Sequence, residues 1–538
     1  MKNYVWWKTS NMYQIWPKSF KDTNNDGIGD LKGVTQKLDY IKDLGFDAIW
    51  LSPFFKSPMA DNGYDVADYY HVNPIFGTDE DFDELIKEAK KRDIKLIIDM
   101  VFNHTSDQHE WFIDACKSKD SIYSDYYIWR DKPDDSITSM FTGPAWTYCE
   151  ARNQYYLHLF DKTQPDLNWD NPKVLEECAK VLDYWHNKKG IAGFRFDVLE
   201  LLGKDIENHI LANGPKLHSR INELMKKGNL TYETVKIGEC WGAGLEETLL
   251  YTDKKNEELS MVFNFKTIKA IKNEEDSRNK IGKLNVEKLK NAIVDFANQV
   301  VQSQGWLSTV LENHDLPRSI SVFGDSDYWQ DSAKTLALLL YSVVGTPFVY
   351  QGQEIGTKNF VGNRYEDFND IELFRMKVNL VDSKKMSDKE FFDLMNWKGR
   401  DNARRPIQWN SEKNFGFTNG TPWITMNNNQ NDITVENQLK DPNSILNFYK
   451  KLNQLRKGEY LDYFVNGNMK LNQSDNEIID FSIELDEKPS LRFIGNFGKN
   501  QNKHIINKYS KIFFNEQNID IKESEIILKP WSSILILE

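Results

Sequence analysis

Short apolar runs rich in β-branched and aromatic residues alternate along the chain with stretches in which apolar residues return every three or four positions. The first pattern is typical of buried strands, and the second of amphipathic helices such as those predicted over 31–44 and 79–91. Strands alternating with helices indicate repeated strand–helix units and a parallel sheet. The eight predicted strands cover 12–16, 47–53, 95–101, 193–197, 235–239, 261–265, 307–315 and 348–352. Eight units predict an α/β fold closed into a (β/α)8 barrel, the TIM barrel.

Two parts of the chain depart from this alternation. The stretch 104–171, between the third and fourth predicted strands, is too long for a loop and rich in Trp, Tyr, Asp and Gly. We expect it to form an inserted subdomain. From 458 to 538, short alternating segments such as 477–485, 490–497 and 526–537 predict a C-terminal antiparallel β-domain. The barrel would then comprise 1–103 and 172–457.

Composition and charge limit the classes of partner that the protein is expected to bind. The formal net charge of −13 disfavours nucleic acid, and no segment approaches the roughly 20 apolar residues that cross a membrane. Residues 1–16 lack the apolar stretch of a secretory signal, so we expect a cytoplasmic location, and we expect a monomer. Four cysteines lie far apart without zinc-ligand spacing, which predicts neither a zinc site nor a disulfide framework. The aromatic content of 13% suits a cleft where flat rings stack on sugars.

Polar residues gather where the predicted strands end. In a barrel of this kind the active site lies at the carboxyl ends of the strands. Taken singly, a strand-end aspartate could cap the next helix, and a strand-end arginine could pair with a structural acid. Together, several carboxylates, two histidines and an arginine on one rim indicate a functional site. These residues are Asp99, His104, Arg195, Asp197, Glu239, His314 and Asp315.

A rim crowded with carboxylates needs a chemical reason, because neighbouring like charges repel and raise one pKa. Glycoside hydrolysis supplies such a reason. One carboxylate acts as nucleophile, and one carboxyl that stays protonated near neutral pH donates its proton to the leaving oxygen.

Five segments together resemble the signature regions of the α-amylase family of glycoside hydrolases, a retaining family that acts on α-glucosides. The fifth of them has the form typical of the oligo-1,6-glucosidase subgroup, and recognisable pieces run from Tyr13 to about Pro422. The segments are 99–104, 193–197, 237–239, 312–315 and 164–169.

This resemblance implies roles for the rim residues. Asp197 would be the nucleophile, Glu239 the acid/base, and Asp315 the residue that clamps the 2- and 3-hydroxyls of the sugar. Arg195 would orient Asp197 and keep it ionised. The side chains that donate to the glucosyl unit would be His104 and His314.

The subgroup also implies a closed first subsite and therefore exo-action, with one glucose released at a time. Asp61 and an arginine of the segment 400–404 would close the subsite behind the non-reducing glucose, and Arg404 is our choice. Tyr64 would stack beneath the sugar ring. If the enzyme is retaining, the Asp197 and Glu239 carboxyl groups should lie about 5–5.5 Å apart.

Two residues on the leaving-group side favour the α-1,6 bond. Valine after the nucleophile accompanies α-1,6 enzymes of the subgroup, and this chain has Val198. Trp241, in the segment 239–243, and the segments 213–218 and 258–263 resemble glucan 1,6-α-glucosidases. We therefore expect release of glucose from isomaltose and isomalto-oligosaccharides by double displacement.

Three alternatives stay open. Trehalose-6-phosphate hydrolase also has valine after the nucleophile, and an α-1,4-glucosidase or a sucrose-active enzyme would use the same chemistry. A non-catalytic barrel scaffold is the third. The chain also departs from its relatives: Leu199-Glu200 stands where Ile-Asn or Ile-Asp is frequent, and Arg405-Pro-Ile where Thr-Pro-Met is usual.

A loop near the start spaces oxygen ligands at alternate positions around a turn glycine, as the first part of an EF-hand does. Its twelfth position is Gly33, so it is not a true EF-hand, and an Asx-rich turn would have the same spacing. The subgroup resemblance implies a structural Ca²⁺ here, although spacing does not distinguish Ca²⁺ from Mg²⁺, and no organic cofactor is expected. The candidate ligands are Asp22, Asn24, Asp26, Ile28 and Asp30.

Overall fold

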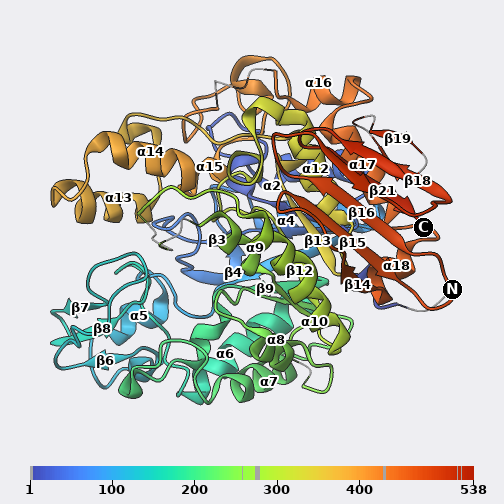
Figure 1. The fold of residues 1–538 in the computed structure, drawn as a ribbon. Coiled ribbons are helices and arrows are strands. Elements are labelled where there is room, and N and C mark those ends of the chain that lie inside the picture. The colour runs from blue at the N-terminus through green and yellow to red at the C-terminus, as the bar shows by residue number, and fades with distance from the viewer. Residues whose placement is uncertain are drawn as a thin grey trace.

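The computed structural model describes residues 4–256, 258–272, 275, 279–427, 430, 432–515, 517, 519–522 and 524–538. Its centre is a closed parallel barrel in the order β1-β13-β12-β11-β10-β9-β5-β2 (Figure 1). All eight predicted strands are present, and the (β/α)8 prediction is confirmed. The strands are β1 (Met12–Ile15), β2 (Ala48–Leu51), β5 (Lys95–Met100), β9 (Gly193–Phe196), β10 (Val235–Gly238), β11 (Met261–Phe263), β12 (Leu307–Thr309) and β13 (Thr346–Tyr350).

Helices cover the outside of the barrel, and α4 (Asp79–Lys91) shows why they form where they do. Thr78 and Asp81 make a reciprocal capping box at its start, and Lys90 and Lys91 lie in its last turn, where a cation favours the helix dipole. Its buried face is apolar, as the periodicity predicts. The other main covering helices are α6 (Pro172–Asp183), α7 (Leu217–Lys227), α8 (Leu245–Thr252), α10 (Phe296–Gln302), α12 (Trp329–Tyr341) and α17 (Ile445–Leu455).

The predicted helix over 31–44 is divided in two. Helix α2 (Leu31–Gln36) ends before Lys37, whose backbone leaves the helical region at φ −103° and ψ 6°, and α3 (Leu38–Leu44) follows. The residues before the break include a glycine and two β-branched residues, which favour the helix less than alanine does. The apolar periodicity continues through the break, so the sequence pattern did not reveal it.

The inserted stretch after β5 carries helix α5 (Glu110–Ala115) and an antiparallel sheet of its own, in the order β6-β8-β7. One apolar cluster supports it, and this cluster also contains Leu201 and Ile206 from the loop after β9. The insertion therefore packs against the carboxyl-end rim of the barrel. Its strands are β6 (Trp129–Arg130), β7 (Trp146–Cys149) and β8 (Gln154–Leu157).

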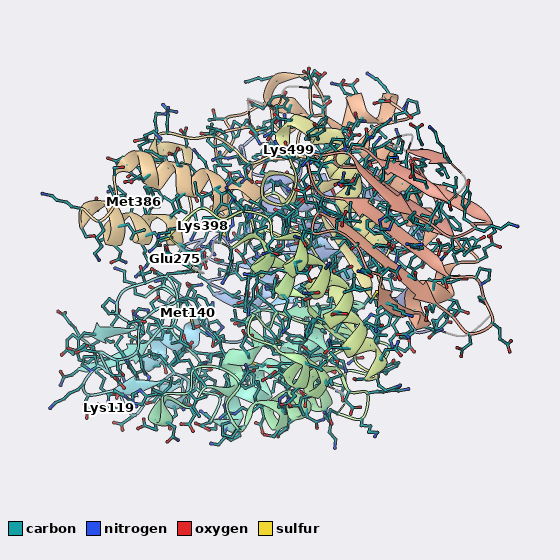
Figure 2. The ribbon with its side chains drawn as sticks, viewed as in Figure 1. Lys119, Met140, Glu275, Met386, Lys398 and Lys499 are labelled. Atoms are coloured by element: carbon teal, nitrogen blue, oxygen red, sulfur yellow. The ribbon has the colours of Figure 1, made fainter. Side chains whose placement is uncertain are left out.

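A second excursion, which the sequence pattern did not separate from the barrel, follows β13. It contains α13 (Ile371–Lys377), α14 (Asp388–Lys398) and α15 (Asp401–Arg404). Arg375 pairs with Asp161 of the insertion, and Asn379 donates a hydrogen bond to Thr142. In Figure 2, Met140 of the insertion and Lys398 of this excursion lie on the facing edges of the two segments. The two excursions thus meet over the same side of the barrel (Figure 1).

The C-terminal part begins with a further short helix, α18 (Leu461–Asn466), and continues as two antiparallel sheets. The alternation predicted for strands is present in β16 (Leu491–Asn496): Phe493 joins the main core, and Ile494 joins the core between the two sheets. The antiparallel β-domain prediction is confirmed. The larger sheet has the order β14-β15-β16-β21-β18 and the smaller β17-β20-β19. The remaining bounds are β14 (Asn468–Leu471), β15 (Ile478–Glu484), β17 (Asn502–Ile505), β18 (Lys511–Phe514), β19 (Asp520–Lys522), β20 (Glu525–Leu528) and β21 (Ser533–Leu537).

Within the described part of the chain, none of the helices has both the length and the apolar character needed to cross a bilayer.

Arg456 joins the end of α17 to the turn between α12 and β13. Its buried guanidinium donates to the carbonyls of Tyr341 and Val343, at 2.9 Å each, and of Gly345. We expect Arg456→Met to lower the free energy of unfolding by about 3 kcal/mol or more, because buried carbonyls lose their donors. Urea denaturation measures this loss. Lys457→Met, which removes only a surface pair with Asp47, should cost less than about 1 kcal/mol. Equal losses would contradict this role for Arg456.

Candidate active site

The barrel brings the predicted rim residues to one end. Asp99 lies in β5 and Arg195 in β9, while Asp197 and Glu239 each follow directly after a strand. His314 lies in the loop after β12. All eight strands run parallel, so their carboxyl ends form a single rim.

Arg195 connects the carboxylates of this rim. Its fully buried Nη1 donates to Asp99 Oδ1 at 2.8 Å and to Asp197 Oδ1 at 2.7 Å. Its Nη2 lies 2.7 Å from Glu239 Oε2. One guanidinium therefore holds the two predicted catalytic carboxyls beside each other. The predicted separation of 5–5.5 Å stays a prediction.

Asp197 differs from a solvent-exposed acid in its titration. Burial raises the pKa of Asp197 well above its usual range, Arg195 opposes this, and the charges of Glu239 and Asp99 raise it further. Arg195 is therefore the group that favours the ionised form of Asp197, which a nucleophile requires.

Val198, which follows Asp197 in the chain and contacts Glu239, has an unusual backbone conformation. Its φ of 35° and ψ of 49° lie in the left-handed region, where a β-branched residue is strained. Such a conformation costs on the order of 1–3 kcal/mol and is characteristic of functional sites. The strained turn directs the Val198 N–H to Glu239 Oε2 at 3.0 Å.

Tyr64 and His314 form a flat stack at the bottom of the site. Their rings are 5.2 Å apart and 7° from parallel, and Trp16 stacks on His314 at 5.1 Å. The Tyr64 hydroxyl donates to Asp99 Oδ2 at 2.9 Å and lies 2.6 Å from His314 Nε2. Because the Gln14 amide lies 2.8 Å from His314 Nδ1, the network assigns the ring proton to Nε2.

His104 is buried opposite this stack. Its Nε2 lies 3.0 Å from the Tyr64 carbonyl, and the Asn103 amide lies 3.0 Å from its Nδ1. Burial lowers the pKa of His104 to about 4. At neutral pH the ring is therefore an uncharged hydrogen-bond donor.

Asp315 is held ionised by cations from the second excursion. Burial alone would raise the pKa of Asp315, but His314, Arg404 and Arg400 hold it well below its usual range. Arg404 Nη2 donates to Asp315 Oδ1 at 2.6 Å, and Arg400 Nη1 donates to the same oxygen at 3.3 Å.

Arg400, and not only the predicted Arg404, lies among the residues predicted to close the first subsite. Arg400 Nη2 lies 3.5 Å from Asp61 Oδ1, and Gln164 donates to Asp61 Oδ2 at 3.0 Å. Arg400 also pairs with Asp370, the residue that caps α13. Arg400 could be predicted from the sequence because it lies in the segment 400–404, which also contains Arg404. No motif around Asp370 indicated a role for that residue.

Trp241 lies beside Glu239. Its indole Nε1 donates to Glu239 Oε1 at 3.1 Å, and its ring stacks on Phe265 with centroids 3.9 Å apart. The side chain is 40% exposed, so one part of the ring is available to a ligand. Asp61 is buried, whereas Trp241 is partly exposed.

The candidate metal loop lies apart from these contacts. Asp22 Oδ1 accepts from the Asn24 and Asn25 amides, at 2.9 and 2.7 Å, and Asp30 caps α2. In the described residues, no three or more His, Cys, Asp or Glu side chains converge as a metal site. As placed, the loop is an Asx-rich turn, with Asn24 and Asp26 exposed. The Ca²⁺ site stays a prediction.

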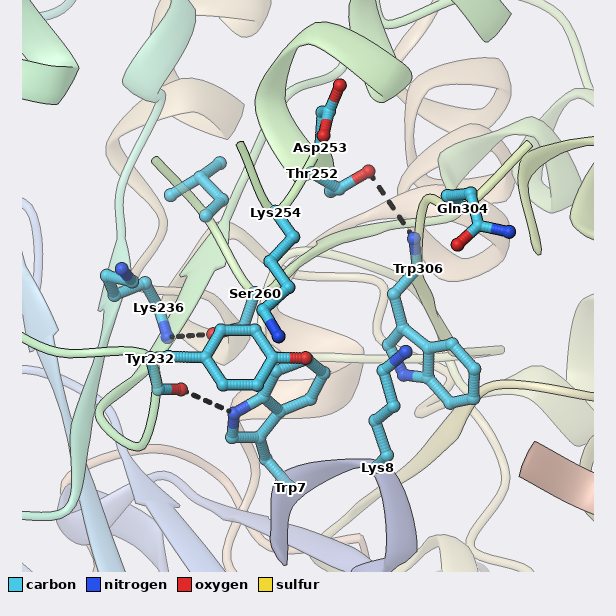
Figure 3. A pocket seen from close by; sticks show the side chains of 11 residues that line it. Trp7, Lys8, Tyr232, Lys236, Thr252, Asp253, Lys254, Ser260, Gln304 and Trp306 are labelled. Carbon is cyan, nitrogen blue, oxygen red and sulfur yellow. Dashed lines mark hydrogen bonds between the residues drawn. The ribbon is translucent and has the colours of Figure 1, made fainter. Parts of the chain in front are cut away.

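A separate cavity lies near the opposite mouth of the barrel (Figure 3). Trp7, Tyr232 and Trp306 line it, with Lys8 Nζ 4.2 Å from the Trp306 ring centre. Ser260 and Trp306 precede strands β11 and β12, so this cavity belongs to the amino-end face. No residue predicted for the active site lines it.

Known proteins place the chain in a family. The pattern for the family "Alpha amylase, catalytic domain" matches residues 14–466. Glucan 1,6-alpha-glucosidase of Streptococcus pneumoniae is 46% identical over 454 residues, 84% of each chain. Oligo-1,6-glucosidase of Parageobacillus thermoglucosidasius is 41% identical over 98% of each chain.

The fold of the chain is also similar to that of a solved structure. The crystal structure of trehalose-6-phosphate hydrolase from Bacillus licheniformis superposes with a TM-score of 0.93 at 36% identity, covering 99% of this chain and 100% of that one. The strand-end carboxylates, the parallel barrel and these similarities agree, and the chain belongs to the α-amylase family of glycoside hydrolases.

Proposed function

We propose that the protein is a retaining, exo-acting α-glucosidase that releases glucose from the non-reducing end of α-1,6-linked gluco-oligosaccharides. The observation that carries this proposal is the Arg195 guanidinium, which holds Asp197 and Glu239 together at the barrel rim. A paired nucleophile and acid are what double displacement at a glycosidic carbon needs.

The proposed reaction has two steps. Glu239 gives its proton to the glycosidic oxygen as Asp197 attacks the anomeric carbon, so the leaving sugar departs and a glucosyl ester forms. Glu239, now a carboxylate, takes a proton from water, and the resulting nucleophile attacks the anomeric carbon. Asp197 leaves, and glucose is released with its original configuration.

The contacts around the first subsite support exo-action. Arg400 lies against both Asp61 and Asp315, and these three side chains would block a further sugar beyond the non-reducing glucose. His104, uncharged at neutral pH, and His314 lie beside the same space and suit sugar hydroxyls, and the Tyr64 ring offers a flat surface. One glucosyl unit would fill the site.

The preference for the α-1,6 bond is supported by Val198, Trp241 and the names of the relatives. Trehalose-6-phosphate hydrolase is the main alternative, because a structure of this type superposes well. That enzyme would need cations near the leaving sugar to hold a phosphate. The contacts that Trp241 makes with described residues are to Glu239, Glu200 and Phe265, which are acidic or apolar. This environment suits a neutral sugar.

The nucleophile assignment is tested by Asp197→Ala. We expect kcat/KM to fall at least about 10³-fold, because an interaction required in the transition state is lost. Added azide should restore turnover and give the β-glucosyl azide, since it attacks from the face that Asp197 occupied. The exposed Asp135→Ala serves as control and should keep full activity. Undiminished hydrolysis by Asp197→Ala would show that the assignment is wrong.

The bond preference is tested with isomaltose, maltose, trehalose 6-phosphate and sucrose. Isomaltose should have the highest kcat/KM, by at least about tenfold. Val198→Thr, which keeps the β-branched shape, should shift the ratio toward maltose. A preference for trehalose 6-phosphate would replace our choice with the alternative, and no glucose from isomaltose would refute it.

We also propose that the loop 22–30 binds a structural Ca²⁺ through oxygens of Asp22, Asn24, Asp26, Ile28 and Asp30. Chelation should then lower the thermal unfolding midpoint by a few degrees, because an ion bound only to the folded state stabilises it. Added Ca²⁺ should restore the midpoint, and Asp26→Asn should abolish the response. An identical midpoint with and without chelator would exclude this site.

The cytoplasmic location and the monomeric state stay predictions.

A further inference from the structure

Glu200 is a buried acid beside the catalytic pair that the reaction described above does not use. It lies two residues after Val198, in the short 3₁₀ turn Leu199–Gly203, and its side chain is only 6% exposed. It therefore calls for a physical role.

The two oxygens of Glu200 have different surroundings. Oε1 accepts the backbone N–H of Trp241 at 3.0 Å. Oε2 is buried and has no hydrogen-bond partner among the residues that the structure describes. An ionised carboxyl with one bare oxygen would be costly in such a place, whereas a neutral carboxylic acid leaves only an unpaired hydroxyl.

The charged and titratable groups around Glu200 also favour its neutral form. Burial, together with the Glu239 carboxylate, raises the pKa of Glu200 to about 8, although the backbone N–H groups of Glu200 and Trp241 and the charge of Arg195 act to lower it. The Cys240 thiol and the Tyr251 hydroxyl also face it, and both are uncharged at neutral pH because burial raises their pKa values. Glu200 therefore carries a proton at neutral pH.

Glu200 contacts the loop that follows Glu239, the proposed acid/base. The Trp241 amide that it accepts belongs to the same residue whose indole Nε1 donates to Glu239 Oε1 at 3.1 Å. The adjoining backbone is also tied, since the Leu199 N–H donates to the Glu239 carbonyl at 3.1 Å and the Asn213 N–H donates to the Glu200 carbonyl at 3.0 Å. A shift of the Trp241 backbone would therefore move the indole away from Glu239.

We propose that Glu200 is a positioning residue that works as a neutral carboxylic acid: it holds the Trp241 amide so that the indole N–H reaches Glu239, and it adds no second negative charge beside the acid/base. This inference deepens the proposed function and rests on it for the roles of Glu239 and of the leaving sugar. The effect should be greatest for substrates whose leaving group is a sugar. Such a leaving group needs both the Glu239 proton and the Trp241 surface.

The test compares Glu200→Gln with Glu200→Ala on isomaltose and on 4-nitrophenyl α-glucoside. Glutamine keeps the acceptor oxygen and cannot ionise, so its kcat/KM on isomaltose at pH 6 should stay within about threefold of the parent. Alanine leaves the Trp241 amide unpaired, and we expect a loss of about tenfold or more on isomaltose. The nitrophenyl substrate needs little acid assistance and should lose much less. Glu207→Ala, an exposed acid of the same loop region, is the matched control and should behave as the parent.

The pH profile gives a second readout that a merely structural role would not change. Glu200 is neutral below its pKa of about 8 and ionises as the pH rises through that value. In the parent, the alkaline decline of kcat/KM on isomaltose should therefore steepen above about pH 8 from one ionisation to two. In Glu200→Gln the decline should follow one ionisation throughout.

Several outcomes would overturn the proposal. These are equal losses in both variants, an equal loss on both substrates in Glu200→Ala, or an unchanged alkaline decline in Glu200→Gln. If Glu200→Ala does not fold, Glu200→Gln and its pH profile decide, and failure of the glutamine variant to fold also counts against the proposal. If the parent releases no glucose from isomaltose, the proposed function fails. The same comparison with the substrate that it does cleave still tests Glu200.

Discussion

A single buried guanidinium, that of Arg195, contacts the carboxylates of Asp99, Asp197 and Glu239 at the rim of the barrel. Three carboxyls this close would repel one another, and each would lose the water that stabilises its charge. The cation offsets part of this cost and determines where the carboxyls lie. Because Asp99 also accepts from Tyr64, which contacts His314, the orientation of the sugar-facing rings depends on the same guanidinium.

The loops after β9 and β10 then give the two acids different surroundings. The strained turn at Val198 aims a backbone N–H at Glu239, and Trp241 brings its indole N–H to the other oxygen of the same carboxyl. Asp197 accepts its hydrogen bond from Arg195 instead. One acid is thus held by neutral donors as well as a cation, and the other mainly by the cation. Such a difference suits an acid/base and a nucleophile.

Two excursions from the barrel enclose this rim. The insertion contributes Gln164, and the excursion after β13 contributes Arg400 and Arg404. The pair between Arg375 and Asp161 connects the two. The surroundings of Asp61 and Asp315 therefore depend on contacts between segments that are far apart in the chain.

The sequence by itself determined the barrel, the two additions and the residues at the strand ends. Buried parallel strands must be apolar on both faces, so each one is a recognisable run, and the chemistry follows where the run stops. Asp197, Glu239 and Asp315 could be predicted as catalytic residues because the segments that contain them resemble signature regions of the α-amylase family. The break at Lys37 left the apolar periodicity intact and could not be predicted from it.

Only the tertiary structure decided which residues touch. That Arg400 reaches Asp61, that Asp370 pairs with Arg400, and that Glu200 accepts the Trp241 amide are contacts between separate loops. The positive φ of Val198 is opposed by the local preference of a β-branched residue. Such a loop conformation is therefore selected by the packing around it. Short-range patterns in a sequence encode strands, helices and caps, whereas burial, and with it the charge state of Glu200, is settled only when distant segments exclude water together.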